Sequence, residues 1–181
     1  GELGFNRKDR MVATGYGKIT VQVDGAVRMP EIQAHVRGAV YQTGLLDFTL
    51  VDIGGQDTKI IKVKNCRVID FMTNDRCAAS SGRYLENMAQ VLGMTMEELS
   101  RYSQEPVELN STCAIFGETE IIAKIVEGCP ISSLAAGINH SLYRRFSGML
   151  ERLSSDIVLL SGGVAKNAAI REIVARETGR K

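Results

Sequence analysis

The feature that most restricts the fold is a strand that runs into an acidic glycine turn and returns as a second strand. Residues 48–53 form a β-branched apolar run that ends at Gly54-Gly55. Two further runs, 58–63 and 67–71, have strand composition and are joined by a turn near Asn65. The three runs predict an antiparallel meander whose first turn is rich in glycine and acid.

Helical spacing follows the meander. We expect helices over 77–92 and 95–103, another that stops at Gly128, and a longer one opened by Pro130. Thr95 and Glu98 have the spacing of a capping box. Short strands within 11–29 and a helix over 31–44 precede the meander, while a buried strand over 157–160 leads through 161–163 into a last helix from about Lys166.

Composition excludes several classes of protein. The 181 residues fit one domain or two small lobes, and a net charge of +1 gives no reason to expect nucleic acid as a partner. No apolar run reaches the ~18 residues of a membrane span, and the first ten residues lack a signal-peptide core. The four cysteines show no CxxC spacing, which argues against a zinc ribbon. So few cysteines in a chain of this length argue against a disulfide scaffold and favour the reducing cytoplasm.

The turn over 52–59 has the residue types of a phosphate and metal site. Gly54 and Gly55 let the backbone approach a phosphate closely and present N–H groups to it. Asp52 or Asp57 can hold Mg²⁺ directly or through water, because carboxylate oxygens are hard ligands. The same turn also contains Gln56, Thr58 and Lys59, of which the last two add a hydroxyl group and a positive charge. An ordinary β-hairpin with Asp and Gly in its turn is the alternative interpretation.

A second glycine loop, Ser161-Gly162-Gly163-Val164-Ala165-Lys166-Asn167, stands between a strand and a helix. A ligand can lie against glycine backbone at such a helix N-terminus. The loop lacks both the P-loop spacing and GxGxxG, and Gly-Gly at a strand end is often only a turn. The two loops together resemble the phosphate-2 and adenosine motifs of the actin/Hsp70/sugar-kinase ATPase superfamily.

Two cysteines stand among small and polar residues just before helical patterns. Cys77 lies in the stretch 74–83 and Cys113 in the stretch 111–118. The free N–H groups and positive dipole end of a helix stabilise a thiolate or an anionic metal cluster. The pair therefore has the character of half of a shared iron–sulfur site, with buried and inert cysteines as the alternative.

The segments that carry these features keep the motif order of one known family. The segments 52–59, 74–79, 82–86, 111–120 and 161–167 resemble the ATP-dependent activators of 2-hydroxyacyl-CoA dehydratases and the related ATPase subunits of benzoyl-CoA reductase. The resemblance extends over nearly the whole chain. It implies an α/β, actin-like ATPase (ribonuclease H-like) fold with a mixed sheet and flanking helices.

The resemblance also implies how the chain is organised. Residues 1–47 would be a remnant of an N-terminal lobe with its connecting helix, and 48–181 a C-terminal lobe with the nucleotide loops and cluster helices. Family members begin with an earlier acidic glycine hairpin, which this sequence lacks, and continue through another helical segment where this sequence stops soon after Asn167. We therefore expect the fold to be incomplete at both ends, with reduced capacity for ATP hydrolysis.

In such an activator, a homodimer would share one [4Fe–4S] cluster between two subunits, each supplying Cys77 and Cys113. ATP or ADP with Mg²⁺ would bind between the glycine loops, and an electron donor such as ferredoxin or flavodoxin would reduce the cluster. The electron would pass to a 2-hydroxyacyl-CoA dehydratase or a related CoA-thioester reductase. The catalytic residues implied are Asp52, Gln56 and Asp57. The nucleotide-binding residues implied are Gly54, Gly55, Thr58, Lys59, Gly162, Gly163, Val164 and Asn167.

Three other functions fit the same sequence: an ATPase subunit of a benzoyl-CoA reductase-type complex, a small-molecule kinase of the same superfamily, and a binding fragment with neither activity. We expect Cys66 and Cys129 to be non-ligands, although a four-cysteine site within one chain is an alternative. His35 and His140 are predicted to have core or surface roles. Arg83 and Glu86 are predicted to pair on a solvated helix face, with contact to the cluster or a partner as the alternative.

Overall fold

A mixed four-stranded sheet forms the centre of the computed structural model, which describes residues 10–20, 25–74, 81–110 and 114–180. Its strand order is β5-β4-β3-β6. The strands are β3 (Phe48–Ile53), β4 (Thr58–Lys64), β5 (Arg67–Asn74) and β6 (Val158–Ser161). β4 is antiparallel to both of its neighbours, and β6 is parallel to β3. The predicted meander is therefore confirmed, and β6 adds a parallel strand beside β3.

Apolar side chains on both faces of β3 explain why this strand is buried along its whole length. Because successive residues of a strand point to opposite faces, Val51 and Ile53 join one hydrophobic cluster while Phe48 and Leu50 join the other. The first cluster packs under α2 (Gly82–Val91) and α5 (Ile131–Leu153). The second packs against α1 (Glu31–Thr43) through Val36. The sheet is thus covered on both faces.

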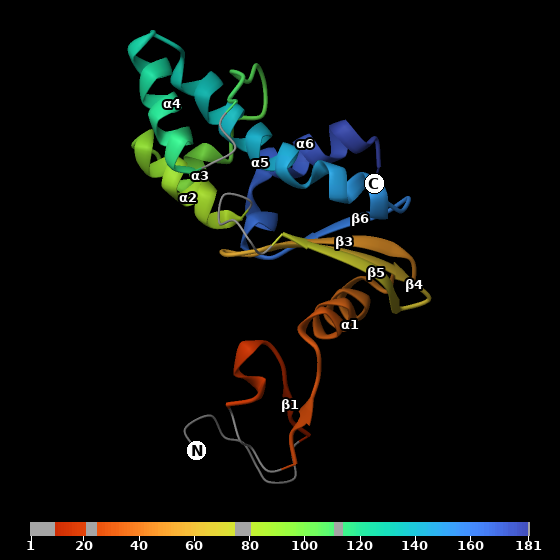
Figure 1. Cartoon of the computed structure of the whole chain (residues 1–181). Helices are drawn as coiled ribbons and strands as arrows, with labels where there is room; N and C mark the ends of the chain where they lie inside the picture. The colour runs from red at the N-terminus through yellow and green to blue at the C-terminus, as the bar shows by residue number, and fades with distance from the viewer. Residues whose placement is uncertain (1–9, 21–24, 75–80, 111–113, 181) are drawn as a thin grey trace.

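Figure 1 shows how the helices are distributed around the sheet. Helix α1 lies on one side of the sheet, while α5 and α6 (Ala168–Thr178) lie on the other. On that second side α2, α3 (Met96–Leu99) and α4 (Ala114–Val126) form a helical lobe. The strands β1 (Val12–Ala13) and β2 (Val27–Arg28), with the 3-10 helix η1 (Tyr16–Lys18), lie beyond α1, away from the sheet.

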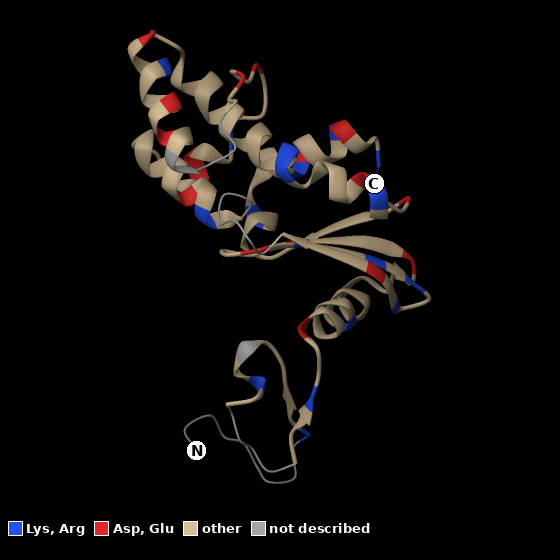
Figure 2. Cartoon of the chain, viewed as in Figure 1, with Lys and Arg blue, Asp and Glu red and all other residues tan. Residues whose placement is uncertain are grey.

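The charged residues of the helical lobe are mostly acidic, as Figure 2 shows. Arg83, Arg101 and Lys124 are its only basic residues over 82–127. The acidic residues of the same stretch are Glu86, Glu97, Glu98, Glu105, Glu108, Glu118, Glu120 and Glu127. In the described residues no helix has the length and apolar character that crossing a membrane requires.

Several predicted boundaries were wrong. Helix α2 begins at Gly82 rather than at Cys77, since Ser81 has an extended backbone with φ −138° and ψ 177°. The capping box of Thr95 and Glu98 is present, but α3 ends at Leu99 rather than at residue 103. The glycine loop forms a separate 3-10 helix η3 (Gly163–Lys166) before α6, and β6 is only half-buried because it is an edge strand of the described sheet.

Candidate functional site

The two predicted glycine loops meet at one cleft of about 500 Å³. The turn between β3 and β4 contributes Gly54 and Gly55. The loop that follows β6, which contains the 3-10 helix η3, forms the wall beside them. Helix α3 forms a third wall, and the first two turns of α2 complete the lining. The lining residues are Gly54, Gly55, Gly82, Glu86, Met96, Glu97, Ser100, Gly163, Val164, Lys166 and Asn167.

Close backbone approach explains why glycine stands at the junction of the two loops. Gly162 has φ +81°, and a Cβ atom built on it would lie 2.3 Å from the carbonyl oxygen of Ile53. An L side chain is strained at that φ and has no room there. Gly82 is similarly crowded, because its Cβ atom would lie 3.1 Å from the carbonyl oxygen of Gly54 and 3.2 Å from Val164 Cγ2. The backbone of β3 and its turn is thus packed directly against the backbone of Gly162 and of the start of α2, and the Val164 side chain packs against Gly82.

The N-terminus of α2 is hydrogen-bonded directly to the β3–β4 turn. Gly82 N donates to the carbonyl oxygen of Gly54 at 2.8 Å, and Arg83 N donates to that of Gly55 at 3.2 Å. Ser81 Oγ also donates to the carbonyl oxygen of Gly55, at 2.9 Å. The first N–H groups of a helix have no partner within the helix, so the turn satisfies two of them. A displacement of the Gly54-Gly55 backbone would therefore reach α2 directly.

Asp52 lies on the opposite side of the sheet, facing α1. Its side chain is buried, with Oδ2 3.0 Å from His35 Nδ1 and Oδ1 accepting a hydrogen bond from Ser161 Oγ at 2.9 Å. Asp52 and Ser161 are register partners on the parallel strands β3 and β6. Both line a second cavity of about 270 Å³ together with His35 and Gly162. Asp52 thus connects the starts of the two glycine loops on the side of the sheet that faces α1.

Lys59 and Asp57 form an ion-pair group with the first turn of α1. Lys59 Nζ lies 2.6 Å from Asp57 Oδ2 and 3.2 Å from Glu31 Oε1. Burial disfavours the charged form of Lys59, but the two carboxylates outweigh that effect and raise the pKa of Lys59 above its ordinary value. The predicted positive charge of the turn is therefore already paired within the described residues.

The remaining predicted residues divide between the cleft and its surroundings. Gly54, Gly55, Gly163, Val164 and Asn167 line the cleft. Of the other predicted site residues that the structure describes, none lines it; they are Asp52, Gln56, Asp57, Thr58, Lys59 and Gly162. Asn167 also caps α6, because its Oδ1 accepts a hydrogen bond from Ile170 N at 3.0 Å.

The two predicted cluster ligands, Cys77 and Cys113, lie outside the described residues. The helices that follow them, α2 and α4, pack closely, since a Cβ atom on Gly117 would lie 3.9 Å from Met88 Sδ. Cys66 is a free, exposed thiol in the β4–β5 turn, where it has φ +59°, and Cys129 is a free, partly buried thiol.

The sequence reasoning missed the third wall of the cleft. Met96, Glu97 and Ser100 belong to α3 and its C-terminal end; the sequence predicts the capping box of this helix, but no motif there marks a binding site. Glu86 pairs with Arg83 at 3.4 Å, as predicted for a solvated helix face, and it also lines the cleft. Only the tertiary fold brings these carboxylates opposite the glycine loops.

Comparison with known proteins assigns the chain to a family. The model of the BadF/BadG/BcrA/BcrD ATPase family matches residues 1–181. The chain belongs to this family of ATPases.

Two relatives illustrate the similarity. The chain is 37% identical over 184 residues to a 2-hydroxyisocaproyl-CoA dehydratase activator from Clostridioides difficile, covering 98% of this chain and 68% of the relative. It is 36% identical over 165 residues to the (R)-2-hydroxyglutaryl-CoA dehydratase activating ATPase from Acidaminococcus fermentans, covering 88% of this chain and 63% of the relative. The chain thus spans about two thirds of the length of these relatives.

Solved structures agree with this assignment. Component A of the (R)-2-hydroxyglutaryl-CoA dehydratase from A. fermentans superposes with a TM-score of 0.86 and 34% identity, over 94% of this chain and 67% of that one. The activator of the 2-hydroxyisocaproyl-CoA dehydratase from C. difficile, solved with bound ADPNP, gives 0.85 and 34%, over 99% and 69%. The ethanolamine utilization protein EutJ from Carboxydothermus hydrogenoformans shares only the fold, at 15% identity and 0.50. The predicted actin-like ATPase fold is therefore confirmed.

Proposed function

We propose that the chain is the nucleotide-binding and cluster-binding part of an ATP-dependent activator that delivers a low-potential electron to a 2-hydroxyacyl-CoA dehydratase or a related CoA-thioester reductase. The observation that carries the proposal is the cleft in which the two glycine loops meet. Glycine backbone admits phosphates closely, and a relative of the same fold was solved with bound ADPNP. The cleft has the volume of a small-molecule or cofactor site.

The charges of the cleft favour one orientation of the nucleotide. Glu97 and Glu86 place carboxylates on the helical side, each in an exposed ion pair with an arginine, so these two residues give that side no net positive charge to attract a phosphate. The phosphates would therefore lie toward Gly54 and Gly55, with the nucleoside between α3 and the Asn167 loop. Carboxylate oxygens at that end are suitable acceptors for ribose hydroxyl groups.

Two acidic residues and one amide are proposed for the metal and the attacking water. Asp57 is partly exposed and keeps one carboxylate oxygen beyond its pair with Lys59, which fits a Mg²⁺ ion held through water. Gln56 is exposed at the tip of the turn, where its amide can orient water. Asp52, paired with His35 and Ser161, would serve the site by fixing the two loops. Mg²⁺ would neutralise charge on the nucleotide phosphates.

The link from the turn to α2 is the proposed route from nucleotide to cluster. Gly82 and Arg83 bond to the turn, and Cys77 precedes that helix by a few residues. We place Cys77 and Cys113 of each of two subunits around one [4Fe–4S] cluster, which when bound supplies one-electron transfer at low potential. Residues 1–47 would belong to the N-terminal lobe and its connecting helix, and 48–181 to the C-terminal lobe.

An exposed apolar surface on α4 supports the homodimer. Ile122 and Val126 lie one turn apart on α4 and are 54% and 83% exposed. Helix α4 follows directly from the segment with Cys113, so this apolar surface belongs to the helix next to the proposed cluster ligand. Apolar side chains of this size are commonly covered at an interface. A ferredoxin or flavodoxin is proposed as the electron donor, in the reducing cytoplasm. One relative, at 29% identity, is a benzoyl-CoA reductase subunit from Thauera aromatica, so an ATPase subunit of such a complex is the second candidate.

Iron and sulfide content per chain, measured anaerobically after reconstitution, tests the proposal. One cluster divided between two chains predicts about two iron atoms per chain in the wild type. Cys77→Ala and Cys113→Ala should each lose the iron, whereas Cys66→Ala, an exposed thiol on another turn, should keep it. A colourless wild-type protein without iron would refute the activator and favour a small-molecule kinase of the same superfamily. Co-purification with dehydratase or reductase subunits separates the two remaining candidates.

A further inference from the structure

The buried side-chain amide of Asn139 connects two walls of the cleft without lining it. Asn139, on α5, is fully buried, and its Oδ1 accepts a hydrogen bond from Asn167 Nδ2 at 3.1 Å. Its Nδ2 points at three carbonyl oxygens, those of Leu99 at 2.9 Å, Tyr102 at 2.9 Å and Ala135 at 3.2 Å. Because carbonyl oxygens only accept, the amide orientation of Asn139 is fixed by its surroundings.

The partners of Asn139 belong to opposite sides of the cleft. Leu99 ends α3, whose Met96 and Ser100 line the cleft, and Asn167 lines the cleft from the other side. A backbone hydrogen bond joins the same two walls, from Ala169 N to the carbonyl oxygen of Ser100 at 2.9 Å. Asn139 adds a buried side-chain connection between α3 and the loop that ends at Asn167.

From this arrangement we infer that Asn139 is a positioning residue of the nucleotide cleft. It sets the distance between α3 and the Asn167 loop, and thereby the fit of the nucleoside, without lining the cleft itself. The inference rests on the proposed nucleotide site and adds a residue that no motif marks. Removing the Asn139 amide takes a donor from the carbonyl oxygens of Leu99 and Tyr102 and takes the acceptor from Asn167 Nδ2, so the two walls would separate or fill with water.

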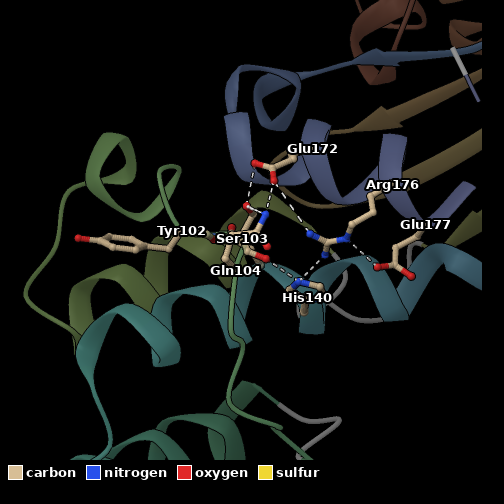
Figure 3. Close-up of polar contacts among 8 residues, drawn as sticks. Tyr102, Ser103, Gln104, His140, Glu172, Arg176 and Glu177 are labelled. Atoms are coloured by element: carbon tan, nitrogen blue, oxygen red, sulfur yellow. Dashed lines mark hydrogen bonds and ion pairs between the residues drawn. The ribbon is translucent and has the colours of Figure 1, made fainter. Parts of the chain in front are cut away.

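The segment after α3 has a second anchor that serves as a matched control. Glu172 on α6 accepts hydrogen bonds from Ser103 Oγ at 2.7 Å and from Gln104 Nε2 (Figure 3). His140 Nε2 lies 3.0 Å from the carbonyl oxygen of Ser103. Figure 3 shows this group joining the loop to α5 and α6. It holds the same segment as Asn139 but is bonded to none of the described residues that line the cleft.

The inference is tested by calorimetry with ADP and with pyrophosphate on Asn139→Leu and on Glu172→Ala. Pyrophosphate reports the Gly54-Gly55 end, which Asn139 does not contact, so its affinity should stay within about twofold. ADP affinity should fall about tenfold or more in Asn139→Leu, as for other residues that hold a binding group in place. Glu172→Ala should keep ADP affinity within about twofold of the wild type, even if its melting temperature falls as much as that of Asn139→Leu.

If Asn139→Leu does not fold, Asn139→Asp replaces it, because aspartate keeps the shape and the acceptor for Asn167 but offers carboxylate oxygens to the carbonyl groups of Leu99 and Tyr102. Equal loss of ADP and pyrophosphate affinity, or unchanged ADP affinity, would overturn the inference.

Hydrogen exchange of the α3 amides separates this inference from the nucleotide proposal. Exchange over 98–100 should accelerate in the Asn139 variant and not in Glu172→Ala, with or without ADP. If the wild type fails to bind ADP, the proposed nucleotide site fails, while the exchange result still decides whether Asn139 fixes α3. Unchanged exchange over 98–100 in the Asn139 variant would refute the positioning role.

Discussion

Two adjacent glycines in the loop after β6 should separate folding from binding. Gly162 has φ +81° and a position where a Cβ atom would lie 2.3 Å from the carbonyl oxygen and 2.7 Å from the carbonyl carbon of Ile53. Gly163, the next residue, lines the cleft, and a Cβ atom added there would meet no atom of the described residues within 4 Å. Alanine at 162 should therefore damage the fold, and alanine at 163 should damage ligand binding.

The loss of folding stability caused by Gly162→Ala can be worked out from these distances. A non-glycine residue in this backbone region costs about 1–3 kcal/mol. Relieving the overlap with Ile53 moves β3 against β6 and costs another ~1–3 kcal/mol, as for an overpacked core. The sum is about 2–6 kcal/mol out of the ~5–15 kcal/mol that stabilises a domain, which lowers the melting temperature by about 10 °C. Differential scanning calorimetry of the full chain measures it.

The Gly163→Ala variant is the matched control. Its melting temperature should stay within a few degrees of the wild type, because the added methyl group meets no atom of the part of the chain that the structure describes. The methyl group would instead occupy space in the cleft and weaken ADP binding about tenfold, or ~1.4 kcal/mol. A Gly162→Ala protein that melts like the wild type would refute the steric argument, and unchanged ADP affinity in Gly163→Ala would show that the nucleotide does not lie against this loop.

Three further substitutions test the surroundings of the cleft. His35→Ala should destabilise the chain by about 1–3 kcal/mol in urea denaturation, because buried Asp52 loses a partner, whereas alanine at an exposed position of α1 should be neutral. Thr95→Ala should lower stability by about 1 kcal/mol. Separately from this cap, the backbone N–H of Thr95, which alanine keeps, holds the pKa of Glu98 below its ordinary 4.5. The contribution of the ionised Glu98 carboxylate is therefore complete above pH 4.5 and fades as the pH falls through the lowered pKa; a urea midpoint series of the wild type in acid measures it. Lys59→Met should lower stability at neutral pH and abolish the part of the alkaline decline that begins above pH 10.5, since the raised pKa of Lys59 keeps its contribution complete below that pH.

The sequence could predict the local elements of the site but not their meeting. β-Branched runs and turn residues marked β3, β4 and β5, and a capping box marked α3, because these signals act over a few residues. The contact between Asp52 and Ser161 spans 109 positions and depends on β6 pairing beside β3, which no local pattern encodes. The start of α2 was misplaced at Cys77 for a similar reason, since its N-terminal N–H groups bond to the distant β3–β4 turn.

The two faces of the β3–β4 turn are held by different kinds of contact, and this difference bears on how a nucleotide would act. Toward α1 the turn is held through side chains, by the pairs of Asp52 with His35 and of Lys59 with Glu31. Toward α2 it is held through the backbone carbonyl groups of Gly54 and Gly55 themselves. A phosphate that pulls on the glycine backbone would therefore move the acceptors of α2 directly, whereas on the α1 side the same shift would reach the helix only through side-chain contacts. The two glycines proposed to admit the ligand thus also supply the carbonyl groups through which α2, and the segment with Cys77 before it, would respond.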